Sequence, residues 1–391
     1  MSKMIPQAEA SEYGFSSKRS GTENAAALNR AAAECETVTV SPAGIYNIAG
    51  TVRLPSDTHL VFADGVVLRR VPLKNKFLEG NLFVNAGAFN GTFNENISIR
   101  GAHIVVNGVE SATISSDDDG KTILKTPNVI TGLRGHIAFL YVKHVLLEDI
   151  LITDLMAKDY GIQVSDFEDV TIRRVHIEGL KDGVHFGPGR HFILRDGKFR
   201  TFDDAIALNC ADYSVSNPNF GSISDGLIEN CVELPGYGNA LFIRILVGTA
   251  RKWQKGMTVY HSDAVLTDSG MYRVVMKPDN TPYVSDTEPR FEEAYRELDG
   301  ILWIKTHKGY APHAIPATAG CRNILCRNIM LEQPRSCAVR IYRNNDAYLR
   351  SWYPGCEMPE ADNIRFEDIK ILKPVDTFLS VETEAANVRV D

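Results

Sequence analysis

One short sequence phrase recurs along the chain and constrains its fold more than any other feature. It consists of a polar residue, alternating apolar residues, an acidic or asparagine turn, and a second run of alternating apolar residues. Clear copies begin at Asn96, His144, Asp169, His191, Asp225, Asn323 and Asn363. Measured one residue later, Val145 and Val170 are 25 residues apart, and Val170 and Phe192 are 22 apart. Periods of about 20 to 30 residues in short β-rich units are typical of a solenoid.

The spacing of apolar residues inside the phrase favours strands over helices. Apolar side chains fall at every second position, and Gly, Asn and Asp separate the short runs. A leucine-rich repeat would need a regular L-x-x-L-x-L frame, and a β-sandwich would need more Asn-Gly-type hairpin turns than are present. We therefore predict an all-β fold, a single-stranded right-handed parallel β-helix that occupies residues 1–391 as one domain.

Two departures from the repeat predict a cap and an insertion. The end coils of a β-helix need covers, and an Ala-rich run after Thr22 predicts a capping helix with Thr22 as its N-cap, within a cap of about residues 20–50. The repeat spacing grows from 34 residues between Phe192 and Gly226 to 98 between Gly226 and Ile324. Residues 246–298, which are polar and aromatic, are therefore predicted to form a long loop insertion near the active-site groove.

Composition excludes several classes of function. The 391 residues carry a net charge of -7, which gives no long-range attraction to nucleic acid or to an anionic membrane. No run of about 18 apolar residues is present, and the N-terminus lacks the apolar core of a secretion signal. We expect a cytoplasmic protein, or a secreted one if a signal has been removed. The 7 cysteines form no C-x-x-C pair and are expected to be reduced and mostly buried; no cofactor or metal is expected, and the oligomeric state is left open.

Three carboxylates fall at matching positions of two successive units. Asp182 precedes Gly-Val-His-Phe, and Asp203 and Asp204 precede Ala-Ile-Ala-Leu 21 and 22 residues later. Because residues one period apart stack in a β-helix, we predict that the three side chains converge. Such a cluster suits glycoside hydrolysis, in which a carboxyl group with a raised pKa protonates the leaving oxygen and ionised neighbours activate water. Asp-Gly turn chemistry and Ca²⁺ binding are the simpler alternatives.

These residues resemble motifs of the polygalacturonase-type glycoside hydrolases (family 28-like) of the pectin-lyase-like β-helix superfamily. Asp182-Gly and Asp203-Asp204-Ala-Ile-Ala-Leu look like the N-T-D and D-D-C motifs, and the segment from Val38 to Tyr46 looks like the first strand and its Pro-x-Gly-x-Tyr turn. The resemblance extends over most of the chain. It implies an inverting mechanism with Asp203 as general acid and with Asp182 and Asp204 positioning water, for which carboxyl groups lie roughly 6.5–9.5 Å apart.

Two further family motifs differ in this sequence. The G-H-G motif falls at Gly-Tyr237-Gly, so that Tyr237, or His185 from an adjoining coil, would replace the histidine. The R-I-K motif falls at Trp303-Ile-Lys305, where tryptophan replaces arginine. In the family this Arg and Lys hold a substrate carboxylate, an ion pair that Trp303 cannot form. Because its ring can stack on a pyranose, we predict a neutral or deoxy sugar at least as readily as standard polygalacturonate.

Several other charged residues compete for roles in binding. Arg244 lies in an otherwise apolar strand and is predicted to contact substrate, with a salt bridge to a catalytic Asp as the alternative. Arg340, one coil further, is a second candidate, with a surface position as the alternative. His307 and Lys308 are expected in a solvated loop. The run Asp117-Asp118-Asp119 reads as a charged loop tip, with metal binding as the alternative.

The sequence therefore predicts a glycoside hydrolase that acts on an oligo- or polysaccharide. A polysaccharide lyase on the same scaffold, with a Lys or Arg base and Ca²⁺, is the first alternative. A non-catalytic, tailspike-like glycan-binding protein is the second, because the same fold supports both.

Overall fold

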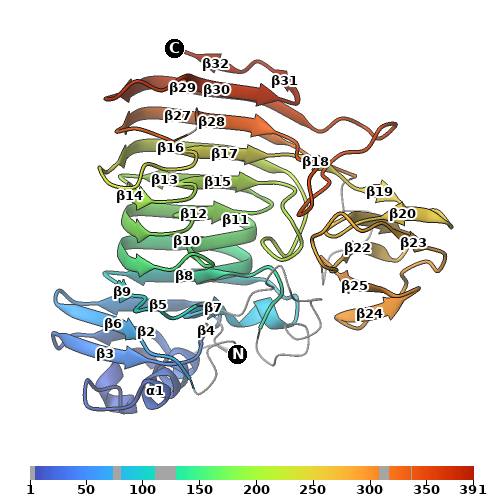
Figure 1. Cartoon of the computed structure of the whole chain (residues 1–391). Coiled ribbons are helices and arrows are strands. Elements are labelled where there is room, and N and C mark those ends of the chain that lie inside the picture. Colours follow the sequence, from blue (N-terminus) through green and yellow to red (C-terminus); the bar gives the residue numbers. More distant parts are fainter. Residues whose placement is uncertain (1–4, 74–80, 111–128, 308–316, 336) are drawn as a thin grey trace.

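The computed structural model describes residues 5–73, 81–110, 129–307, 317–335 and 337–391. Its main strands stack as the coils of a right-handed parallel β-helix, which rises from the N-terminal to the C-terminal end (Figure 1). The first coils comprise β1 (Ile5–Glu9), β2 (Cys35–Val40), β3 (Gly44–Ile48), β4 (Val52–Leu54), β5 (Thr58–Phe62), β6 (Val66–Arg70), β7 (Phe83–Asn85), β8 (Asn94–Arg100) and β9 (His103–Val105). The central coils comprise β10 (Gly135–Leu155), β11 (Tyr160–Gly179), β12 (Val184–Phe186), β13 (Gly189–Arg195), β14 (Lys198–Thr201), β15 (Ile206–Asn209), β16 (Ile223–Glu233) and β17 (Ile243–Leu246). The last coils comprise β27 (Cys321–Leu331), β28 (Cys337–Tyr342), β29 (Glu360–Ile371), β30 (Thr377–Glu382), β31 (Glu384–Ala386) and β32 (Arg389–Val390).

Apolar columns fill the interior of the helix. Val184, Ile206, Ile243 and Val339 pair in register on four successive coils and are all buried. Parallel strands lie about 4.8 Å apart, so each of these side chains contacts the equivalent one in the coils before and after it. Burying a Val or Ile side chain stabilises the fold by about 1.5–3 kcal/mol, and the column repeats this contribution in every coil.

The repeat read from the sequence is the repeat of the structure. Val145 pairs with Val170, Val170 with Phe192, Phe192 with Gly226, and Gly226 with Ile324. The parallel β-helix and this alignment are therefore confirmed, including the pairs on either side of the 98-residue interval.

The polar residue that opens each phrase has a backbone role. All seven opening residues have φ between 50° and 59°, the left-handed region, which Asn, Asp and His adopt more readily than most other residues. Several of them also contact the next opener in the stack: Asn323 donates to Asp225 at 2.8 Å, and Asn363 donates to Asn323 at 3.0 Å. The phrase thus begins with a polar residue because the chain bends there and the bends stack.

The N-terminal coil is covered by α1 (Gly21–Glu34), whose buried face is rich in alanine. Its N-cap is Ser20, not Thr22 as predicted. The Ser20 side chain accepts from the backbone of Glu23, and the Glu23 carboxylate accepts from the backbone of Ser20, which completes a capping box. Thr22 lies inside the first turn of the helix.

The predicted insertion is folded rather than a loop, and it lies to one side of the coils (Figure 1). It runs from β18 (Gly248–Thr249) to β26 (Thr318–Ala319), which pair with each other at its base, so it extends beyond the predicted end at residue 298. Between them are β19 (Arg251–Lys252), β20 (Met257–Val259), β21 (Ala264–Thr267), β22 (Gly270–Val274), β23 (Tyr283–Ser285), β24 (Tyr295–Leu298) and β25 (Ile301–Lys305). Five of these strands form one sheet in the order β19-β21-β22-β25-β24, with an apolar core of its own.

Two predictions from composition can be compared with the structure. All 7 cysteines are free, and six of them are buried, as expected. Within the described ranges, no helix has the length and apolar character needed to cross a membrane.

Candidate functional site

The structure brings the three aspartates together at one edge of the coils. Asp182 lies just before β12, and Asp203 and Asp204 lie just before β15, the strand that pairs with β12. The backbone N–H of Gly183 donates to the carbonyl of Asp204 at 2.9 Å, which fixes the two turns side by side. One oxygen of each carboxyl group lies within 4.8 Å of one oxygen of the other two. This spacing is shorter than the separation of roughly 6.5–9.5 Å that the resemblance led us to expect.

Asp204 and Asp182 differ in charge although both are buried. Burial raises the pKa of Asp204, the negative charge of Asp182 raises it further, and it reaches about 8. Burial also raises the pKa of Asp182, but the Lys181 ammonium and a hydrogen bond from His185 outweigh burial and hold this pKa well below its usual value. At neutral pH the pair therefore holds one protonated and one ionised carboxyl group.

Lys181 is the cation of the cluster. Its Nζ donates to Asp203 Oδ2 and lies 3.5 Å from Asp182 Oδ1. Burial lowers the pKa of Lys181, but the nearby carboxylates raise it well above its usual value, so the side chain stays charged. The three carboxyl groups are a donor set that suits Ca²⁺; however, the Lys181 ammonium already contacts two of them, Asp182 and Asp203.

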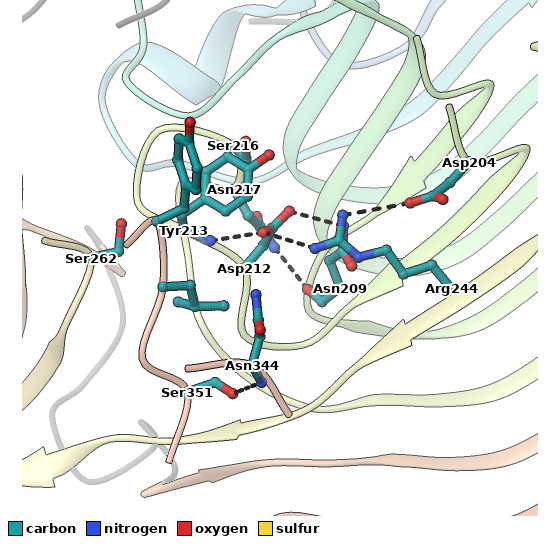
Figure 2. Close-up of polar contacts among 12 residues, drawn as sticks. Asp204, Asn209, Asp212, Tyr213, Ser216, Asn217, Arg244, Ser262, Asn344 and Ser351 are labelled. Carbon is teal, nitrogen blue, oxygen red and sulfur yellow. Dashed lines mark hydrogen bonds and ion pairs between the residues drawn. The ribbon is translucent and has the colours of Figure 1, made fainter. Parts of the chain in front are cut away.

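Arg244 contacts the opposite side of the cluster. Its Nη1 lies 3.5 Å from Asp204 Oδ2, and its Nη2 lies 3.4 Å from Asp212 Oδ1 (Figure 2). The alternative of a contact with an aspartate of the cluster is therefore observed, and contact with substrate stays a prediction for a residue that also lines a cavity. The cavity has a volume of about 380 Å³ and is lined by Lys181, Asp203, Asp204, Tyr213, Ala240, Leu241, Arg244, Arg340, Tyr342, Asn344, Asp346 and Tyr348.

His185 lies behind the cavity and not in it. It is fully buried, stacks on Tyr160 with a centroid distance of 4.2 Å, and its Nδ1 lies 3.3 Å from Asp182 Oδ2. Its Nε2 lies 2.9 Å from the side-chain amide nitrogen of Asn209. The prediction that His185 binds substrate is therefore wrong, because the ring is covered on all sides; its contact is with a carboxylate of the cluster.

The residues matched to the R-I-K motif are not at the site. Trp303 lies in β25 of the insertion and is fully buried in the apolar core there, so its ring cannot stack on a sugar. Lys305, at the end of the same strand, pairs with Glu292 at 2.7 Å. Tyr237, matched to the G-H-G motif, is about half exposed and makes an edge contact with Phe202, 6.3 Å between centroids, away from the cavity lining. These three assignments to substrate binding are corrected.

Arg340 does line the cavity. It follows Arg244 in register on the next coil, pairs with Glu382 at 2.7 Å, and lies over the Tyr342 ring at 4.2 Å. The coil therefore continues with Arg340-Ile-Tyr342, and the 98-residue interval had displaced the motif match from this strand to the insertion.

Of the residues predicted to lie in loops, His307 is among those that the structure describes. His307 is buried rather than solvated, with Nδ1 3.7 Å from Asp166 Oδ1. Lys308 and the run Asp117-Asp118-Asp119 lie outside the described residues.

Two residues of the site were not predicted from the sequence. Asn209 is the last residue of β15, and Asp212 lies in the loop that follows. Asp212 is fully buried and accepts from Asn209 at 3.0 Å and from the backbone N–H of Tyr213 at 2.8 Å (Figure 2). A third acidic residue within nine positions of Asp203 was the signal that could have identified it.

No model of a known protein family matches the sequence. No curated protein matches it either. Among solved structures, a hyperthermoactive exopolygalacturonase from Thermotoga maritima is 12% identical, with a TM-score of 0.50, over 100% of this chain and 82% of that chain. An iota-carrageenase complexed to iota-carrageenan fragments is also 12% identical, with a TM-score of 0.50, over 97% of this chain and 92% of that one. At this identity the likeness shows the fold, a parallel β-helix, and the earlier resemblance is confirmed at the level of the fold.

Proposed function

We propose that the protein is a glycoside hydrolase in which Asp204 is the proton donor. The observation that supports this most strongly is the buried Asp204 carboxyl group on the wall of a cavity, with one oxygen within 4.8 Å of an oxygen of Asp182 and of Asp203. Burial and the charge of Asp182 raise the pKa of Asp204 to about 8, which suits a proton donor. The structural neighbours described above, which include an exopolygalacturonase, supply the same fold.

This proposal exchanges two roles that the resemblance implied. Asp203 was expected to be the general acid, but it forms an ion pair with Lys181 and so presents a carboxylate to the cavity. In the proposed reaction, the Asp204 carboxyl group protonates the glycosidic oxygen as the bond to the anomeric carbon breaks. The Asp203 carboxylate accepts a proton from the attacking water or stabilises the positive charge on the sugar. Asp182, buried behind them, raises the pKa of Asp204 and need not touch substrate.

The stereochemical outcome is open to a direct measurement. The resemblance implies inversion, whereas oxygens within 4.8 Å of one another are nearer to the carboxyl separation of about 5–5.5 Å in retaining enzymes. Proton NMR of the first-formed anomer distinguishes the two outcomes, and either one is compatible with Asp204 as proton donor.

We further infer that the substrate carries acidic sugars. The prediction of a neutral sugar depended on Trp303, which is buried in the insertion. The cavity wall instead carries Lys181, Arg244 and Arg340, against the carboxylates of Asp203 and Asp346. Arg244 and Arg340 also pair with Asp212 and Glu382 outside the lining, so the support comes from three cationic side chains that face the cavity and could bind the carboxylate or sulfate group of a sugar.

The test is a hydrolysis screen on acidic oligosaccharides, each paired with its carboxyl-reduced or desulfated counterpart. We expect new reducing ends from an acidic member of a pair, a much lower rate with its neutral counterpart, and loss of turnover with Asp204→Asn. A lyase is the second candidate, because three carboxylates could hold Ca²⁺. An unsaturated, ultraviolet-absorbing product that requires Ca²⁺ would establish the lyase and refute hydrolysis. Glycan binding without turnover of any glycan tested would instead indicate a binding protein.

A further inference from the structure

Asp212 lies in the loop after β15 and connects the two sides of the aspartate cluster. Its carboxylate is fully buried, and Figure 2 shows it facing the Arg244 guanidinium. Oδ1 lies 3.4 Å from Arg244 Nη2, and Oδ2 lies 3.6 Å from His185 Nε2. Arg244 in turn contacts Asp204, and His185 contacts Asp182. The buried Asp212 carboxylate is therefore connected to Asp204 through Arg244 and to Asp182 through His185.

The contact of Asp212 with Arg244 affects the charge of Asp204. An arginine 3.5 Å from a carboxyl group normally favours its ionised form. Here the same guanidinium also faces the Asp212 carboxylate, which is buried and cannot exchange its partner for water. Asp212 therefore competes with Asp204 for the arginine, and this competition leaves Asp204 free to keep its proton.

The contact of Asp212 with His185 affects the position of Asp182. The Asn209 side-chain amide donates to both His185 Nε2, at 2.9 Å, and Asp212 Oδ2, at 3.0 Å. With Nε2 accepting, the ring proton is on Nδ1, where it points at Asp182 Oδ2 at 3.3 Å. Asp212 and Asn209 thus fix the tautomer and the orientation of the ring that contacts Asp182.

We propose that Asp212 is a positioning residue which, by sharing Arg244 with Asp204 and by orienting His185 toward Asp182, keeps the proton of the cluster on Asp204. This inference rests on the proposed function for its meaning in catalysis, but it can be tested without any substrate. The groups that face Asp204 are the carboxylates of Asp182 and Asp203, the Lys181 ammonium, the Arg244 guanidinium and the Tyr342 hydroxyl. Asp212→Asn leaves all of these in place, removes the charge that competes for Arg244, and alters the contacts with Asn209 and His185.

The experiment is a pH titration of the carboxyl C=O stretch by difference infrared spectroscopy on the full chain. The band of Asp204 is identified by its absence in Asp204→Asn. In the wild type it should disappear near pH 8. In Asp212→Asn the band should disappear at a pH at least about one unit lower, because Arg244 then pairs with Asp204 alone. At a given pH this shift makes the ratio of protonated to ionised Asp204 about tenfold smaller. The matched control is Asp368→Asn, an exposed residue in the left-handed region, with φ 53°, where asparagine fits; its titration should equal that of the wild type.

A second comparison covers the case in which Asp212→Asn does not fold. The double variant Asp212→Asn/Arg244→Gln removes both charges of the pair and leaves no unpaired buried ion between them. It should titrate within one pH unit of Arg244→Gln alone, because the route through the arginine is absent from both variants and only the route through His185 differs between them. An unchanged titration in Asp212→Asn, or a difference of one unit between these last two variants, overturns the inference. If the titrations behave as expected and no glycan is hydrolysed, the proposed function fails and the positioning role stands.

Discussion

Replacing Asp204 with asparagine removes the one proton on which the proposed reaction depends, at almost constant side-chain volume. With a pKa of about 8, the carboxyl group at pH 7 is protonated about ten times more often than it is ionised. General acid catalysis contributes about 10²- to 10⁴-fold to the rate, so kcat on the natural glycan should fall by that factor. This corresponds to about 3–5 kcal/mol of transition-state stabilisation.

The assay that identifies a proton donor compares leaving groups. A glycan leaving group needs protonation, whereas a dinitrophenolate leaves without it. Asp204→Asn should therefore lose activity on the glycan and keep most of it on a dinitrophenyl glycoside of the same sugar, while Asp203→Asn should lose activity on both. The wild-type kcat should decline as the pH rises through about 8, and this limb should be absent in Asp204→Asn. Equal losses of Asp204→Asn on both substrates would refute the assignment of the proton donor.

The same substitution has a consequence for stability that needs no substrate. The pKa of Asp204 is higher in the folded chain than its value of about 3.9 in an unfolded one, so the proton binds the folded state more tightly. The stability that this group contributes is fully present below about pH 4 and is lost as the pH rises toward about 8, with a slope of about 1.4 kcal/mol per pH unit. The stability of Asp204→Asn relative to the wild type, from urea unfolding, should therefore increase over this range. Parallel stability curves for the two proteins would contradict the raised pKa.

Three further predictions concern residues around the cavity and in the insertion. Lys181→Met should lower kcat at least about tenfold, because Asp203 loses its ion pair and Asp182 loses the cation that lowers its pKa; unchanged kinetics would show that the contact is incidental. Trp303→Ala should lower the free energy of unfolding by about 3–5 kcal/mol, while the folded fraction should keep its KM, because the ring is core and not a sugar platform. Tyr353→Phe should lower the free energy of unfolding, measured by thermal denaturation, by about 1–3 kcal/mol, because the hydroxyl donates to the buried Asp263 at 2.6 Å. A decrease of less than about 0.5 kcal/mol would mean that the carboxylate finds another donor.

The sequence is sufficient to predict the coils because one physical constraint repeats in every one of them. A β-helix needs an apolar residue inward and a residue tolerant of positive φ at each bend, and these requirements place Val145, Val170 and Phe192 in one column. The alignment across the insertion also follows, since Gly226 and Ile324 begin the same phrase after equivalent polar residues. Position within a coil is thus encoded locally, residue by residue.

Sequence counting fails where the chain leaves the coils. Trp303 was matched to the R-I-K motif because Trp303-Ile-Lys305 was expected on the next coil, but the insertion forms its own sheet and uses apolar alternation for its own core. A strand pattern such as Ile-Leu-Trp-Ile-Lys is the same in a coil and in an antiparallel sheet, because both have a period of two. Arg340 carries the corresponding position, and only the register of β28 against β17 reveals it.

The roles within the aspartate cluster lie beyond the sequence for a different reason. Asp203 and Asp204 are adjacent and chemically identical, and stacking alone predicts that both come near Asp182. Their neighbours in space distinguish them. Lys181 forms an ion pair with Asp203, whereas Asp204 is buried between Asp182 and Arg244, which also contacts Asp212. A charge at one aspartate and a proton at the other follow from these contacts, because an ammonium stabilises a carboxylate and burial beside a negative charge opposes a second one. Which of the two aspartates carries the proton and which carries the charge is therefore decided by their neighbours, and exchanging those neighbours should exchange the roles.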